Sequence, residues 1–227
     1  MTVFTHKGIE LELPDWLLGT KIEDKIRRGH YEKKEAEAAR KRLREGMKVL
    51  EIGAGLGFVT SICAQIAGAE NVVSVEADPK MLDPIRGNLA RNGHGDVTLI
   101  HGAVVPGEYQ DDTVMFRPGT LFWGGSLPQV PTSADRLVDV PALQLTTLLK
   151  QVRPKFVMMD IEGAEQHLFY QPWPRFVRFV VLELHPSKYD DNAIHRIMQC
   201  MGASGLAYDP VSSNGTTLGF KRFRRGK

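Results

Sequence analysis

The sequence has few cysteines and no long apolar run. Its two cysteines, Cys63 and Cys200, are far apart, so they form neither a disulfide framework nor a thiolate metal site. No run approaches the roughly 18 apolar residues that a membrane-spanning helix needs. The N-terminal residues lack the basic region and apolar core of a signal peptide. These absences predict no membrane partner and a reducing, cytoplasmic setting.

No strong charge of one sign points to a nucleic-acid partner. The formal net charge is +2, and the chain has 42% hydrophobic and 25% charged residues, which is typical of a globular protein. The basic tail at 221–227 is more typical of a solvated chain end than of a phosphate-binding site, and no basic stripe is interleaved with aromatics. We therefore expect no nucleic-acid partner. The oligomeric state stays open, and a homo-oligomer is compatible with the sequence.

Strands and helices alternate from residue 46 onward, which predicts an α/β fold with a mainly parallel sheet and helices on both faces. The expected strands are 47–52, 71–76, 97–101, 155–160 and 177–183, and the expected helices are 57–68, 79–92, 143–151 and 189–203. A split pattern at 206–209 and 216–222 predicts a C-terminal antiparallel hairpin, which makes seven strands in all. Residues 1–45 are expected to form an N-terminal hairpin and helical extension. The domain proper covers 46–227, with a substrate-side insertion at about 104–136.

A glycine-rich turn follows the first predicted strand of this domain. The segment Val49-Leu-Glu-Ile-Gly-Ala-Gly-Leu-Gly57 runs from an apolar strand into a turn and then into an apolar-periodic helix. This order places helix N-terminal amides against a ligand, so we expect Gly53, Ala54, Gly55 and Gly57 to contact a cofactor.

Two acidic residues indicate the charge of that cofactor. Glu51 at the strand end would repel a dinucleotide diphosphate, but it would attract the ammonium and sulfonium groups of S-adenosylmethionine (SAM). Glu76 ends the next strand, where an acidic residue accepts hydrogen bonds from ribose hydroxyls. We predict SAM as the cofactor, with Ala77 beside Glu76 and with the backbone of Gly102 and Ala103 along the adenine. A Rossmann-like sheet of the class I methyltransferase type fits this pattern.

The fourth and fifth strands end in further candidate residues. The fourth runs into Asp160, Glu162 and Glu165, which crowd one strand-to-helix corner, and His185 follows Glu183 at the end of the fifth. A carboxylate with a raised pKa or an imidazole is able to act as a general base. The alternatives are that Glu162 or Glu165 is only a helix N-terminal residue and that His185 is structural. We assign no metal ligands, although Asp160, Glu162 and Glu183 would suit Mg²⁺ if a divalent ion bound.

Four segments together resemble the FkbM-type methyltransferases. They are Met159-Asp-Ile-Glu-Gly-Ala-Glu165, Val181-Leu-Glu-Leu-His-Pro186, Gly29-His-Tyr-Glu32 and the glycine turn, and the similarity covers about residues 29–205. The resemblance implies a SAM-dependent O-methyltransferase acting on hydroxyls of sugars, macrolides or other secondary metabolites. It also implies that Asp160, Glu162 and His185 face the methyl acceptor.

We therefore expect a SAM-dependent methyltransferase that methylates a hydroxyl of a small molecule. Methylation of an amine or a carboxylate is the alternative within enzymes. A SAM-binding protein without catalysis and a nicotinamide-dependent dehydrogenase are the alternatives outside this class. The residues do not identify the acceptor.

Overall fold

The computed structural model describes residues 2–117 and 137–223, and all structural statements refer to these residues. None of the helices they form is long and apolar enough to cross a membrane. The strands are β1 (Thr2–His6), β2 (Ile9–Leu13), β3 (Val49–Ile52), β4 (Val72–Glu76), β5 (Thr98–His101), β6 (Ala103–Val105), β7 (Thr113–Phe116), β8 (Val138–Gln144), β9 (Phe156–Met159), β10 (Phe179–Glu183), β11 (Leu206–Tyr208) and β12 (Thr217–Arg222). The α-helices are α1 (Lys21–Arg27), α2 (Lys33–Arg42), α3 (Phe58–Ala67), α4 (Leu82–Arg91), α5 (Leu145–Val152) and α6 (Asp191–Ala203). Short 3₁₀ turns lie at Asp15–Leu17, Ala69–Asn71, Pro79–Met81 and Ala164–His167.

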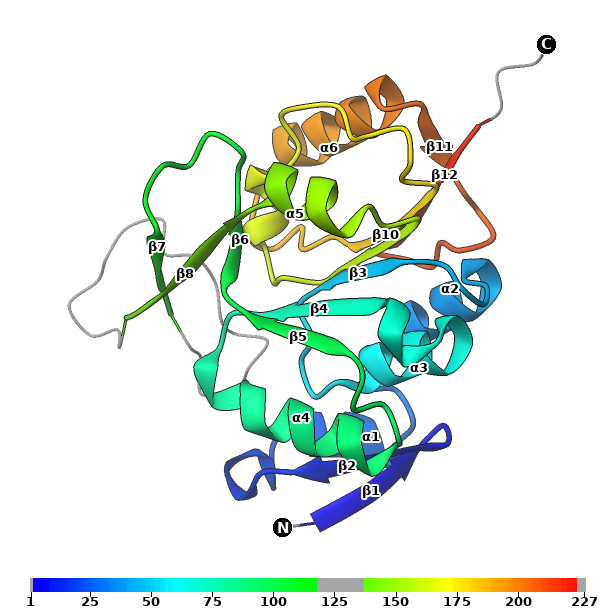
Figure 1. The fold of residues 1–227 in the computed structure, drawn as a ribbon, viewed down its shortest axis with the longest axis vertical. Coiled ribbons are helices and arrows are strands. Elements are labelled where there is room, and N and C mark those ends of the chain that lie inside the picture. Colours follow the sequence, from blue (N-terminus) through cyan, green and yellow to red (C-terminus); the bar gives the residue numbers. More distant parts are fainter. Residues whose placement is uncertain (1, 118–136, 224–227) are drawn as a thin grey trace.

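The central sheet has seven strands in the order β11-β12-β10-β9-β3-β4-β5 (Figure 1). The five strands from β10 to β5 are parallel, and β12 pairs antiparallel with both β10 and β11. This confirms the predicted sheet and its C-terminal hairpin. The chain leaves β3 toward β4 on one side and returns to β9 on the other, so the strand order reverses next to β3. In open α/β sheets, ligands bind at this switch point.

Alternating side chains of the central strands pack into two separate apolar cores, one on each face of the sheet. Phe156 and Met158 of β9 face the core shared with α2, α3 and α4, whereas Val157 and Met159 face the core shared with α5 and α6. This alternation is the period of two of an extended strand. The sheet is therefore covered by helices on both faces, which explains why its central strands read as continuous apolar runs.

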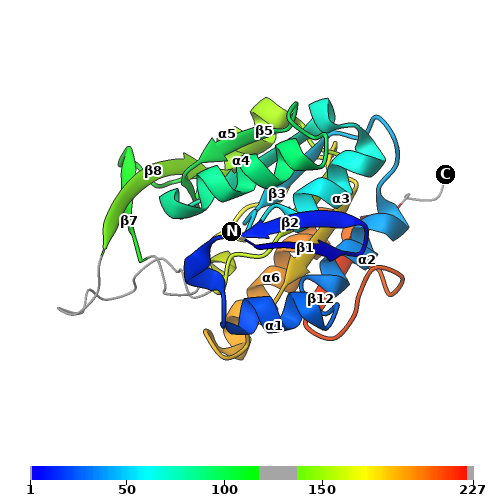
Figure 2. The same cartoon turned by 90° about the horizontal axis from the view of Figure 1, so that it is seen from below.

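The N-terminal hairpin β1–β2 is part of the first core. Ile9, Leu11 and Leu13 are fully buried in the same cluster as residues of α3 and α4. Figure 2 shows the hairpin lying beneath these helices, and β2 contacts both of them. We predicted the hairpin correctly. However, the region that we expected to be an extension shares its core with the sheet.

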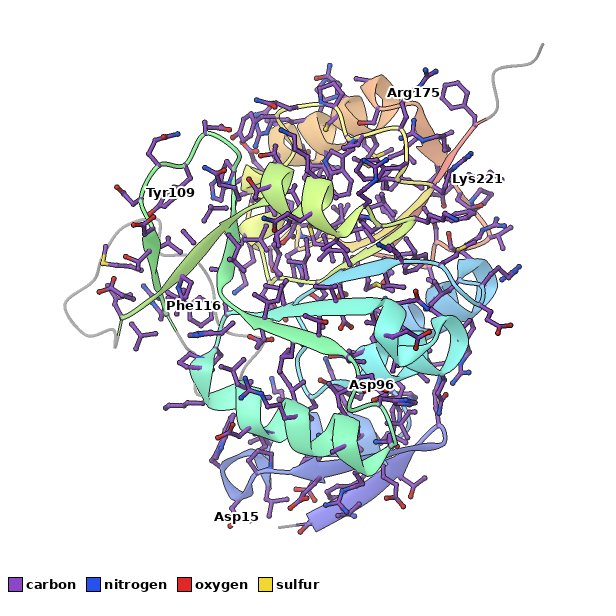
Figure 3. The ribbon with its side chains drawn as sticks, in the orientation of Figure 1. Asp15, Asp96, Tyr109, Phe116, Arg175 and Lys221 are labelled. Carbon is purple, nitrogen blue, oxygen red and sulfur yellow. The ribbon has the colours of Figure 1, made fainter. Side chains whose placement is uncertain are left out.

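Part of the expected insertion at 104–136 is a second, small sheet. Strands β6, β8 and β7 lie in that order, with β6 parallel and β7 antiparallel to β8. Phe116 of β7, labelled in Figure 3, packs with Ala103 and Val140 in a small third cluster. The sequence analysis located no strands at β6 and β7, because short strands between Pro and Gly residues give little periodic signal. The rest of this insertion, residues 118–136, lies outside the described residues.

A buried ion pair joins helix α2 to the C-terminal hairpin. The Arg42 guanidinium donates to both carboxylate oxygens of Asp209 at 2.5 Å, and the Asp209 side chain is fully buried. The Lys221 ammonium, labelled in Figure 3, lies 3.5 Å from the same carboxylate. Burial by itself would raise the pKa of Asp209, but hydrogen bonds from Arg42 and Ser212 hold this pKa below its usual value. Asp209 therefore needs Arg42 to stay charged inside the fold.

We expect Arg42→Met to lower the free energy of unfolding at pH 7 by about 3 kcal/mol or more, because it leaves a buried carboxylate without its main partner. A group with a depressed pKa stabilises the fold above its unfolded pKa, and this contribution is lost as pH falls. The difference between the wild type and Arg42→Met should therefore shrink below about pH 4. Urea titrations at several pH values measure it. Arg28→Met is the matched control, since it breaks the exposed pair with Asp24 and should cost only about 0.5 kcal/mol. Equal effects of the two substitutions would contradict the assignment.

Candidate functional site

The glycine turn after β3 adopts a backbone that suits glycine. Gly53, Gly55 and Gly57 all have positive φ, at 93°, 57° and 78°. Gly57 caps α3, and its amide donates to the Ala54 carbonyl at 2.8 Å. Three left-handed residues in five positions explain the G-x-G-x-G spacing, because residues with a Cβ rarely adopt this conformation.

Gly53 also lies against the fourth parallel strand. A Cβ on Gly53 would lie 1.9 Å from the carbonyl oxygen of Asp160. The amide of Asp160 donates to the Ile52 carbonyl at 3.0 Å, which holds the two strand ends together. The cofactor turn and the acidic corner predicted from the sequence therefore touch at the switch point of the sheet.

Glu76 binds the glycine turn itself. Its Oε2 accepts hydrogen bonds from the amides of Ala54 and Gly55, each at 3.1 Å, and its Oε1 accepts one from the amide of Asp78 at 2.8 Å. A carboxylate has about four acceptor positions, so capacity remains for a ribose hydroxyl. Burial raises the pKa of Glu76 to about 7 despite these hydrogen bonds.

Glu51 lies deeper than the sequence led us to expect. It is 1% exposed, and its Oε2 accepts hydrogen bonds from the hydroxyls of Thr60 and Ser74, both at 2.5 Å. Its Oε1 is buried without a hydrogen bond among the described residues. Burial raises the pKa of Glu51 to about 7. One oxygen thus has a structural role, and attraction of the SAM cation by the other stays a prediction.

The residues predicted beside the adenine lie where the two sheets meet. The amide of Gly102 donates to the Glu76 carbonyl at 2.9 Å, and a Cβ on Gly102 would collide with the Leu143 side chain at 2.7 Å. Ala103 pairs with Ala142 in the second sheet. Ala77 packs against the third apolar cluster. These residues lie together, and their contact with adenine stays a prediction.

The structure brings the three predicted acceptor-side residues together. Nε2 of His185 lies 3.5 Å from Oδ1 of Asp160 and 3.5 Å from Oε2 of Glu162. The parallel pairing of Met159 with Leu182 explains this, because it places the ends of β9 and β10 side by side. Glu162 has a positive φ of 53°, a strained conformation for a non-glycine residue.

Glu165 is a functional residue that we left outside the predicted site. It is fully buried, and its Oε1 lies 2.9 Å from Nδ1 of His185 and accepts a hydrogen bond from the Tyr189 hydroxyl at 2.7 Å. Its Oε2 accepts from the amide of Gly163 at 2.8 Å. Burial by itself would lower the pKa of His185, but the hydrogen bond and charge of Glu165 raise it overall. The only sequence signal was its place in the Asp-Ile-Glu-Gly-Ala-Glu segment.

A cavity of about 170 Å³ lies beside this corner and is lined on one side by residues of the N-terminal segment. Basic and aromatic residues of 25–34 line part of it. Five carboxylates also line it, namely Glu32, Glu35, Asp160, Glu162 and Glu183. Burial, together with the charges of neighbouring carboxylates, raises the pKa of Asp160 well above its usual value. Burial also raises the pKa of Glu32 and Glu35. Glu32 and Glu35 were not among the predicted site residues, because no short-range pattern connects α2 with β9.

Comparisons with known proteins match part of the chain, and the range of the family model includes the glycine turn and Glu76. A family model described as protein-L-isoaspartate(D-aspartate) O-methyltransferase matches residues 27–112. The protein-L-isoaspartate O-methyltransferase of Methanococcoides burtonii is 41% identical over 61 residues, which are 26% of this chain and 30% of that protein. That of Methanococcus aeolicus is 31% identical over 93 residues, which are 40% of this chain and 41% of that protein. The chain therefore matches less than half the length of these relatives.

Solved structures show the fold over almost the whole chain. Trm5b from Pyrococcus abyssi superposes with a TM-score of 0.51 at 14% identity and covers 97% of this chain and 55% of that one. A putative SAM-dependent methyltransferase from Streptococcus mutans gives 0.50 at 11% identity, with the same coverage. The chain thus has the class I SAM-dependent methyltransferase fold, as predicted. The predicted cofactor agrees with the matched family, whereas the FkbM-type assignment rests on the sequence resemblance.

We expect Gly53→Ala to lower the free energy of unfolding by about 4 kcal/mol or more, or to prevent folding, because its Cβ overlaps the Asp160 carbonyl in a packed strand junction. Gly46→Ala is the matched control. Gly46 has a φ of 71°, but nothing lies within 4 Å of an added Cβ. Gly46→Ala should lower the free energy of unfolding by only about 1–2 kcal/mol, because alanine is strained in the left-handed conformation. Urea unfolding of both variants measures the difference, and a Gly53 variant no less stable than the control would refute the close contact.

Proposed function

We propose that this protein is a SAM-dependent O-methyltransferase that methylates a hydroxyl group. The observation that carries this proposal is the contact between Gly53 and the Asp160 carbonyl oxygen. It places the turn expected to hold SAM directly beside Asp160, Glu162 and His185. A methyl donor and an acceptor oxygen bound on either side of this contact would be close enough for direct transfer.

The charge of the acceptor side favours a neutral acceptor. The five carboxylates that line the cavity outnumber its three lysines, so they disfavour a carboxylate substrate, whereas a hydroxyl is able to donate a hydrogen bond to such groups. The FkbM-type resemblance of Met159–Glu165 and Val181–Pro186 supports hydroxyls of small molecules such as sugars. In this proposal Asp160 or His185 removes the hydroxyl proton as the methyl group moves in line from sulfur to oxygen.

A second candidate is methylation of a protein carboxylate. It is supported by the match of residues 27–112 to the isoaspartate methyltransferase model. That match includes Gly53 and Glu76, but it ends before Asp160 and His185. It therefore supports the cofactor more directly than the acceptor.

SAM binding is expected to strengthen as pH rises from 6 to 8. The pKa of Glu76 is raised to about 7, and a cationic ligand favours the ionised carboxylate, so binding should release a proton in this range. We expect SAM affinity to rise roughly threefold to tenfold over this range. This is a change of about one logarithmic unit or less in the binding constant. Glu76→Gln should bind SAM more weakly at pH 8 and lose most of this pH dependence.

Isothermal titration with SAM measures these affinities, and Glu70→Gln is the control for the loss of a carboxylate near the protein surface. NADH binding more tightly than SAM would overturn the cofactor. A Glu76→Gln variant with wild-type affinity at both pH values would remove Glu76 from the SAM site.

The stability of the product distinguishes the acceptors. Radiolabelled methyl transfer from SAM should be tested with polyhydroxylated small molecules, amines and an isoaspartyl peptide. We expect a methyl ether, which survives mild alkali, whereas a methyl ester from a carboxylate would release methanol. Asp160→Asn should reduce transfer by about 10²-fold or more if Asp160 takes the proton. Alkali-labile product from the peptide alone would favour the second candidate. SAM binding without transfer to any acceptor class would support a non-catalytic protein.

A further inference from the structure

Three potential metal ligands converge beside the cavity. One donor atom each from Asp160, Glu183 and His185 lies within 4.8 Å of the others. Asp160 follows β9 directly, Glu183 ends β10, and the register of these parallel strands places the two residues next to each other. His185 follows two residues later. This triangle is small enough for one ion to reach all three donors without moving the strands.

The buried Glu165 orients the imidazole of His185 on the side of the ring away from Asp160. Its Nδ1 lies 2.9 Å from Oε1 of the fully buried Glu165, which also accepts the Tyr189 hydroxyl. An ionised Glu165 is able only to accept a hydrogen bond. In a neutral His185 ring the hydrogen is therefore on Nδ1, which donates it to Glu165. In the neutral ring the lone pair of Nε2 then faces Asp160 and Glu162, where a bound cation would take the place of the second proton of the charged ring. Metal-binding histidines in proteins are commonly held by a carboxylate in this way.

One oxygen at the centre of this cluster is buried without a hydrogen bond from the part of the chain that the structure describes. Oδ1 of Asp160 is buried and makes no hydrogen bond among the described residues, although Nε2 of His185 lies 3.5 Å away. Buried acceptors are normally hydrogen-bonded, and a buried oxygen without a donor is costly. A bound cation would satisfy both this oxygen and the facing lone pair of Nε2.

We propose that Asp160, Glu183 and His185 bind one divalent cation, with Glu165 as the positioning residue for His185. Two carboxylates and one imidazole suit Mn²⁺, because Mn²⁺ prefers oxygen donors and accepts nitrogen. The site is separate from the residues matched by the isoaspartate methyltransferase model. If the proposed function holds, an acceptor hydroxyl bound to this cation would lose its proton more readily, and the cation would replace the base role that Asp160 or His185 has in the metal-free form of that proposal.

Electron paramagnetic resonance of Mn²⁺ titrated into the full chain, without SAM, tests this proposal. The six-line signal of free Mn²⁺ should decrease with one ion bound per chain, and the bound ion should show hyperfine coupling to one imidazole nitrogen. Asp160→Asn and Glu183→Gln should each weaken binding by at least tenfold. Glu165→Gln should weaken it about 10-fold to 100-fold through the orientation of His185. Glu45→Gln, at an exposed carboxylate, should leave it unchanged.

Absence of binding to the wild type, or binding without nitrogen coupling, would overturn the site whether or not the variants fold. Wild-type affinity in a folded Asp160→Asn variant, checked by circular dichroism, would also overturn it. Methyl transfer separates this inference from the proposed function. Mn²⁺ binding without transfer to any acceptor would support the site and contradict the function. Transfer in excess chelator by a chain that binds no Mn²⁺ would support the function and contradict the site.

Discussion

The close approach of β3 and β9 at the switch point is the constraint on which the rest of the site depends. Gly53 has to lack a side chain there, because the Asp160 carbonyl occupies the space of a Cβ. The same approach lets the Asp160 amide extend the ladder to Ile52. It therefore brings a glycine turn that leads into α3 to the same place as the carboxylates that end the neighbouring strands. A single backbone contact thus links the turn proposed to hold SAM to the acidic residues proposed to face the acceptor.

This arrangement concentrates negative charge in a partly buried space. Removal of carboxylates from water raises their pKa, and each ionised neighbour raises it further. The fold offsets part of this cost locally. Amides of the glycine turn bind Glu76, hydroxyls of Thr60 and Ser74 bind Glu51, and Tyr189 binds Glu165. Among the described residues, Oδ1 of Asp160 lacks such a donor, as does Oε1 of Glu51, but only Asp160 lies together with Glu183 and His185, which makes it the centre of the proposed cation site.

Much of the fold was predictable from local patterns. The five parallel strands were located to within two residues at each end, because their apolar runs are bounded by glycine, proline and charged residues. The ends of the helices were predicted to within three residues. The predicted helix 79–92 consists of the 3₁₀ turn Pro79–Met81 followed by α4. The small sheet of β6, β7 and β8 was missed because β6 and β7 are short and pair with β8 across a long connection, so no periodic pattern reveals them. The packing of the N-terminal hairpin into the main core was missed for a related reason, since Ile9, Leu11 and Leu13 indicate a buried face but not what covers it.

The amino-acid sequence by itself determined the glycine turn, the acidic residues at the strand ends and the order of strands and helices. These features follow from local rules of backbone conformation, periodicity and charge. Only the tertiary structure decided which of these residues meet. His185 and Glu165 are 20 positions apart and become partners because β9 and β10 are parallel neighbours. The tertiary structure likewise turned Glu51 inward toward Thr60 and Ser74 and brought Glu32 of the N-terminal segment to the cavity, because strand register and helix packing set these distances and sequence spacing does not.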